Sequence, residues 1–185
     1  MPTPRLAYED LPAPLREQLK GRVAYLGHLG EFFQVAALQP EALGHFLAYT
    51  DALKAALPLR LTEIVTLTVA AETENEYELG MRERLGLPTE LDPAEVRALV
   101  TGDVHSVQSF SPTDIAAADL ARAVAGARGR SCHEPYERLE GLETPALAVG
   151  CLMLATRFLA HGTMANTWSL LSPARPAAPA AVTES

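Results

Sequence analysis

The chain has 185 residues, of which 48% are hydrophobic and 21% charged, a composition typical of a globular domain large enough to bury its own core. Its formal net charge is -8 at pH 7 and its basic residues form no cluster, which argues against binding to the phosphate backbone of nucleic acids. The first residues contain no apolar segment of the kind found in secretory signals, and we therefore expect a cytoplasmic protein.

Helical periodicity dominates the first half of the chain, and no stretch alternates as a strand does. The pattern predicts helices over residues 8–20, 21–38 and 40–56. Residues 60–85 follow as one long helix, or as two helices that meet near residues 72–73. Because the first half of this segment is apolar on nearly every side, it is predicted to be a central helix.

Three further helix starts follow. Asp92 and Ser111 each precede a proline and have an acidic residue three positions later, which is the pattern of a helix cap and first turn. Thr144 opens a last helix that extends to about residue 171. Its most apolar run, residues 145–155, is too short to span a bilayer, so we expect a buried helix and no membrane association.

These patterns together predict one all-α domain over residues 1–172 with a flexible, Pro- and Ala-rich tail over residues 173–185. Two helices, within residues 60–85 and 144–171, are apolar around most of their circumference. A domain of this size has room for few such helices in its interior. We therefore expect a helical bundle with a central buried helix pair, and a homo-oligomer.

The most informative residues lie in the segment 60–85. Glu63 lies in its apolar half, where a carboxylate needs a partner or a function. Asn75, Glu78 and Arg82 are spaced to share one helix face, next to Tyr77. An alternative is that Glu78 and Arg82 form only a solvated pair, worth about 0.3–0.5 kcal/mol.

This segment resembles the signature helix of the carboxymuconolactone decarboxylase and alkyl hydroperoxidase D-like family. Members share an Arg-x-x-Glu-type start, then a small residue or Cys twelve positions after the Glu, an aromatic residue two later, Cys or Glu one after that, and His four further on. The corresponding positions here are Glu63, Asn75, Tyr77, Glu78 and Arg82. The run is similar to the branch of the family that lacks the thiols, and the resemblance covers roughly residues 30–100.

The resemblance implies an oligomeric AhpD-like helical fold and a small-molecule activity. Thiol peroxidases of the family use a Cys-x-x-Cys thiolate, but Asn75 and Glu78 occupy those positions here, and Arg82 replaces the histidine and is a poor proton shuttle. A decarboxylase-like activity on a small organic acid needs no thiol: Arg82 would bind a carboxylate and Glu63 would move a proton. The alternative is a non-catalytic, oligomeric relative that serves as a scaffold.

Two other residues, His161 and Cys132, could carry chemistry. His161 could supply the imidazole that is missing at Arg82, although a lone histidine in such a helix is more often a satisfied core residue. Cys132 precedes a helix, where a thiol pKa can fall, so a peroxidase-related activity through this residue is a third hypothesis. Cys151 is surrounded by apolar residues and is predicted to be a core residue. We find no convergent metal ligands and no nucleotide motif, and predict neither a metal nor a cofactor.

Overall fold

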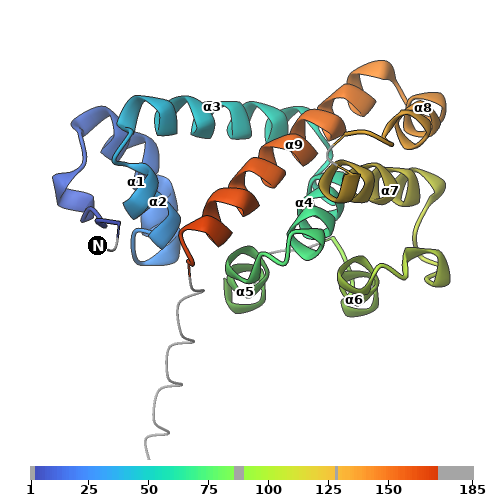
Figure 1. The fold of residues 1–185 in the computed structure, drawn as a ribbon, viewed down its shortest axis with the longest axis horizontal. Helices are drawn as coiled ribbons and strands as arrows, with labels where there is room; N and C mark the ends of the chain where they lie inside the picture. Colours follow the sequence, from blue (N-terminus) through green and yellow to red (C-terminus); the bar gives the residue numbers. More distant parts are fainter. Residues whose placement is uncertain (1–2, 86–89, 128, 171–185) are drawn as a thin grey trace, which may run out of the picture.

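A computed structural model describes residues 3–85, 90–127 and 129–170, and the side chains of all of these except residues 82–85. Every regular element in the described residues is a helix, which confirms the predicted all-α class (Figure 1). In chain order the elements are η1 (Tyr8–Asp10), α1 (Ala13–Leu26), α2 (Glu31–Ala36), α3 (Pro40–Ala56), α4 (Leu59–Glu72), α5 (Glu76–Leu85), α6 (Pro93–Thr101), η2 (Val104–Ser106), α7 (Pro112–Ala127), α8 (His133–Leu142) and α9 (Pro145–Thr167).

The predicted boundary between helices 8–20 and 21–38 is wrong. Helix α1 continues through Gly21 and ends at Gly27, whose φ of 75° is in the left-handed region that glycine adopts without strain. The Gly27 N–H donates to the Val23 carbonyl at 2.8 Å and closes the helix. The short α2 then begins after Gly30, so the second predicted helix is in fact the end of α1 followed by a turn and α2.

The segment 60–85 forms two helices rather than one. α4 ends at Glu72, and Glu74 in the connecting turn has a φ of 50°. Asn75 fixes the turn from both sides, because its N–H donates to the Ala70 carbonyl at 2.8 Å and its Oδ1 accepts from the Glu78 N–H at 3.2 Å. The second contact is that of a helix N-cap, so the side chain of Asn75 starts α5.

α4 is the central helix, as predicted. All of its residues from Leu61 to Ala70 are buried, and it packs against α6, α7 and α9. α9 packs against α3, α4, α7 and α8, and leaves Val149 and Met153 exposed. By length and composition, α9 is long and apolar enough to cross a membrane, contrary to the expectation from its apolar run alone. In this fold it packs against other helices as a core helix.

The core divides into two hydrophobic clusters joined by α9. The larger cluster lies around α4 and contains most of the buried residues of α6, α7, α8 and the first half of α9. The smaller cluster combines α1, α2 and α3 with Tyr77 of α5 and Ala165 of α9. Figure 1 shows α9 running diagonally between the group α1–α3 and the group α4–α8. The candidate site lies where these two groups meet.

Candidate functional site

Glu63 is a buried and partnered acid, as predicted. It lies in the first turns of α4, is 4% exposed, and its Oε2 accepts a hydrogen bond from the Glu90 N–H at 3.0 Å. Glu90, which comes after α5 in the chain, therefore lies against Glu63 in α4. Glu63 is not among the described residues that line the cavity containing Tyr77, Glu78 and His161, so the structure separates it from these three candidates.

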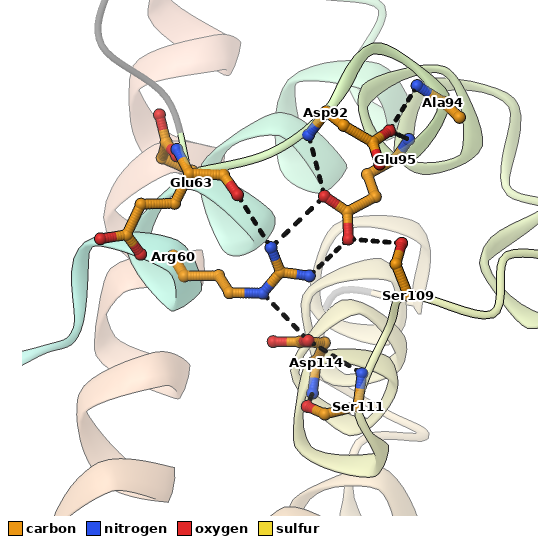
Figure 2. A network of polar contacts seen from close by, with 9 residues as sticks. Arg60, Glu63, Asp92, Ala94, Glu95, Ser109, Ser111 and Asp114 are labelled. Carbon is orange, nitrogen blue, oxygen red and sulfur yellow. Dashed lines mark hydrogen bonds and ion pairs between the residues drawn. The ribbon is translucent and has the colours of Figure 1, made fainter.

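The surroundings of Glu63 are a polar network centred on Arg60 (Figure 2). Arg60 binds Glu95 on α6 through Nη2 and Oε1 at 2.6 Å, and Asp114 on α7 through Nε and Oδ2 at 3.1 Å. Its Nη1 donates to the Glu90 carbonyl at 3.0 Å. Hydrogen bonding to Arg60 lowers the pKa of Glu95 to about 2, and the same contacts raise the pKa of Arg60. The network joins the first turns of α4, α6 and α7, and its cation, Arg60, is paired with two carboxylates. This arrangement is typical of a structural site.

The candidate site is instead a cavity of about 290 Å³ between the two halves of the fold. Five helices line it, so no single sequence segment defines it. The lining residues are Arg22, Tyr25 and Leu26 of α1; Phe32 and Phe33 of α2; Leu47, Thr50 and Lys54 of α3; Tyr77, Glu78 and Met81 of α5; and Arg157, Phe158 and His161 of α9.

α5 contributes two of the predicted residues to this cavity. Tyr77 is 5% exposed, its hydroxyl accepts from the Phe32 N–H at 3.4 Å, and burial raises its pKa to about 12. Glu78 lies one residue further and reaches the cavity wall. Asn75 does not line the cavity; it is buried and caps the helix that presents Glu78.

His161 brings an imidazole to the same place from α9. Its Nδ1 lies 3.9 Å from Glu78 Oε2, and its ring lies against Phe32 with 4.3 Å between the ring centroids. The side chain is buried, and Nδ1 has no hydrogen-bond partner among the described residues. Burial lowers the pKa of His161 to about 4, against a smaller raising effect of Glu78, so the ring is neutral at pH 7. His161 is thus a core histidine by its burial, with an Nδ1 that the described residues leave without a hydrogen bond.

Arg157, one helical turn before His161, is the main residue that sequence reasoning missed. It is 8% exposed, its Nε donates to Thr50 Oγ1 at 2.7 Å, and it forms no ion pair with any described residue. Its guanidinium carbon lies 4.4 Å from the ring centre of Phe46 and 4.3 Å from that of Phe158. Burial lowers its pKa to about 10, so it is still a cation at pH 7.

Arg82, the fourth residue predicted for the site, belongs to α5 by its backbone, and its side chain lies outside the described residues. A signal for Arg157 was present in the sequence: it is the one Arg, Lys, Asp or Glu in the 23 residues of α9. A single charge in an otherwise apolar helix is typical of a buried functional group.

Comparison with solved structures identifies the architecture. A peroxidase-related protein from Ralstonia eutropha JMP134 with an alkylhydroperoxidase AhpD core superposes with a TM-score of 0.77, at 20% identity and covering 94% of each chain. The debrominase Bmp8 superposes with a TM-score of 0.79 at 15% identity, covering 94% of this chain and 93% of its own.

The fold is that of the AhpD core. A protein of unknown function from Agrobacterium tumefaciens is also similar, with a TM-score of 0.64 at 12% identity over 75% of this chain and 94% of its own. No family model matches the sequence, and no curated protein matches it significantly. These similarities establish the AhpD-like fold, and the chemistry has to be argued from the residues of the cavity.

Neither cysteine belongs to the cavity. Cys132 precedes α8 and is buried in the larger hydrophobic cluster. Cys151 is fully buried in α9, and burial raises the pKa of its thiol to about 12, which keeps it protonated at neutral pH. The cavity of this AhpD-like chain therefore has acid, base and cationic side chains on its wall, and no thiol among the described residues.

Proposed function

We propose that this cavity binds a small organic acid, whose carboxylate lies against Arg157, and that Glu78 and His161 supply acid–base chemistry beside it. The observation that carries the proposal is the buried guanidinium of Arg157, which lines the cavity and forms no ion pair with a carboxylate of the described residues, although Glu78 and Asp51 attract it from a greater distance. We thus assign to Arg157 of α9 the anion-binding role that the sequence suggested for Arg82.

The energetics of Arg157 favour an anionic ligand. Removing a charge from water costs several kcal/mol unless partners replace the water. The hydroxyl of Thr50 and the rings of Phe46 and Phe158 supply part of that replacement, with cation–π contacts worth about 1–2 kcal/mol each when desolvated. A carboxylate in the cavity would add a charge-assisted, bidentate hydrogen-bond pair that the protein itself does not provide.

The local charge supports the same ligand class. The chain as a whole carries a formal charge of -8, yet the described cavity wall has three cationic side chains, Arg22, Lys54 and Arg157, and one carboxylate, Glu78; Arg22 is paired with Asp51. A local excess of positive charge in an acidic protein attracts small anions to the cavity. The aromatic walls favour a planar ligand; Bmp8, which shares the fold, has been solved with the small planar ring 2,3,4-tribromopyrrole bound.

Benzoate and its neutral analogue benzamide test the proposal, because they have the same shape and differ in charge. Binding at tenfold excess over Kd stabilises the folded state by about 1.4 kcal/mol, which for a domain of this size raises Tm by about 3–5 °C. We expect that shift with benzoate and none with benzamide. The substitution Arg157→Met should abolish the benzoate shift, since it removes the charge and keeps much of the side-chain volume.

Two further variants make the result decisive. Arg157→Lys keeps the charge and loses the planar fork, so a reduced benzoate shift is expected. Arg138→Gln on α8 removes an arginine that does not line the cavity and should leave the shift unchanged. A protein that responds to no carboxylate, or an Arg157→Met variant that responds as the wild type does, would leave the non-catalytic scaffold as the better description.

A further inference from the structure

His161 is placed to respond to an anion in this cavity. Its Nδ1 is buried without a hydrogen-bond partner among the described residues, and the side chain forms part of the cavity wall. The ring is held between Phe32 and Phe158, with centroid separations of 4.3 and 6.1 Å. A fixed imidazole in the wall of a cavity is a group that can bind a ligand directly.

The charges around His161 come from four helices. α5 supplies Glu78, whose Oε2 is 3.9 Å from Nδ1, and the neutral hydroxyl of Tyr77. α9 supplies Arg157 and α3 supplies Lys54, while Arg22 of α1 also lines the cavity and is paired with Asp51 of α3. α2 contributes only aromatic rings to this wall. Burial and the cations Arg157 and Lys54 therefore outweigh the carboxylate of Glu78, and the ring stays neutral.

We infer that His161 takes up a proton when an organic anion binds beside Arg157, so that ligand binding and protonation of this imidazole are coupled. The inference deepens the proposed function and rests on it. The proton comes from solvent and is added to a ring-nitrogen lone pair, while every bond of the ligand is retained. The imidazolium formed then donates a charge-assisted hydrogen bond to the anion, which makes His161 a ligand-binding group rather than a packing residue.

The sign of the pH dependence follows from two states. In the free protein the pKa of His161 is low, at about 4, because burial disfavours its charge. A bound anion favours the charged form and raises the pKa. Between the two values binding takes up a proton, so affinity increases as pH falls through the bound-state pKa, by up to about tenfold per pH unit, and levels off below the free-state pKa.

Isothermal titration calorimetry of the wild-type protein with benzoate at pH 6.5 measures this proton directly. The titration is repeated in Bis-Tris and in imidazole, which differ in ionisation enthalpy and are cationic buffers that do not compete for an anion site. Benzenesulfonate serves as a second probe because it cannot exchange a proton in this range. We expect net uptake approaching one proton per ligand with both probes, and an affinity that falls from pH 6 to pH 8.

His161→Gln keeps a polar side chain and cannot titrate, so its uptake should fall to near zero and its affinity should lose the pH dependence. His133→Gln is the matched control, because His133 is exposed on α8 and lies outside the cavity. Binding without proton uptake, or uptake that persists in His161→Gln, overturns the coupling and leaves the proposed function intact. Absence of any binding to either probe overturns both.

Discussion

Two arginines of this chain have opposite electrostatic surroundings. Arg60 binds Glu95 and Asp114, and its pKa is raised by those contacts. Arg157 is more deeply buried, contacts a hydroxyl and two aromatic rings, and its pKa is lowered to about 10. A network that satisfies every charge stabilises the fold, whereas a buried cation without an acid gains most from an external partner. The contrast separates a structural site from a ligand site.

The structural role of the Arg60 network predicts a specific dependence on pH. The pKa of Glu95 in the folded state is lowered from 4.5 to about 2, so its contribution to stability is fully present above pH 4.5 and is lost as pH falls through about 2. Glu95→Gln should be less stable at pH 7 by roughly 3 kcal/mol, because Arg60 loses a buried partner. The difference from wild type should shrink as pH falls from about 4.5 to 2.

Urea unfolding at a series of pH values measures that difference. Glu137→Gln provides the control, because Glu137 is an exposed acid on α8 whose one ion pair among the described residues is with His133. Its free energy of unfolding should follow the wild-type curve. A constant gap between wild type and Glu95→Gln down to pH 2 would show that the ionised form of Glu95 has no special role in the fold.

At the scale of the elements, the approach of α9 to the turn between α4 and α5 positions the cavity. Gly162, next to His161, has no side chain; a Cβ built there would lie 2.8 Å from Thr73 Oγ1 and 3.5 Å from Asn75 Nδ2. Asn166 then ties α9 to the turn, its Nδ2 donating to the Thr73 carbonyl at 2.6 Å. The turn that caps α5 and the helix that holds His161 are therefore in direct contact.

Gly162→Ala should destabilise the protein by about 1–3 kcal/mol, because the added methyl group forces α9 away from Thr73. Gly141→Ala on α8 is the matched control: no atom lies within 4 Å of a Cβ at that position, and alanine favours a helix over glycine by roughly 0.5–1 kcal/mol. Thermal unfolding should give a lower Tm for the first variant and an equal or higher Tm for the second. A Gly162→Ala protein as stable as wild type would mean that the contact is loose.

Local sequence patterns predicted the elements better than they predicted the site. The buried character of α4 and the cap at Asp92 follow from periodicity and short-range hydrogen bonding, and both are present. Tyr77 and Glu78 were found because they are neighbours on one helix. On α9 the sequence offered His161 as a possible imidazole but gave no reason to join it with Arg157 and Glu78, since the meeting of α5 and α9 depends on packing between segments about eighty residues apart.

The separation of Glu63 from the cavity has a similar cause. Glu63 lies nine positions before the end of α4 at Glu72, and a straight helix rises about 1.5 Å per residue, so the acid is roughly 13 Å from the turn. Sequence spacing alone allowed a compact cluster of Glu63, Glu78 and Arg82. The break at Thr73 redirects α5 towards α1–α3, and the cluster that forms there contains Glu78, Arg157 and His161 instead.

At the scale of the whole molecule, the charge is distributed unevenly. An acidic chain with a net charge of -8 repels copies of itself, and a face without charge is where two copies can approach at least cost. The outer side of α9 is such a face, because Arg157 is buried and the exposed residues of this helix are uncharged. They are Pro145, Ala146, Val149, Met153, Thr156, Ala160, Thr163, Asn166 and Thr167.

We propose that a second copy of the chain covers this face, with Val149 and Met153, which are 42% and 38% exposed, at its centre. Apolar side chains at the centre of an interface contribute most when they are fully desolvated, and a carboxylate there would be left unpaired.

The double variant Val149→Asp, Met153→Asp should therefore be monomeric in sedimentation velocity with unchanged helical circular dichroism, while the wild type sediments as a larger species. Val100→Asp, which changes an exposed valine on α6, should sediment like wild type. A wild-type protein that stays monomeric at concentrations of tens of micromolar would contradict the proposal, and the uncharged face of α9 would then need a different explanation.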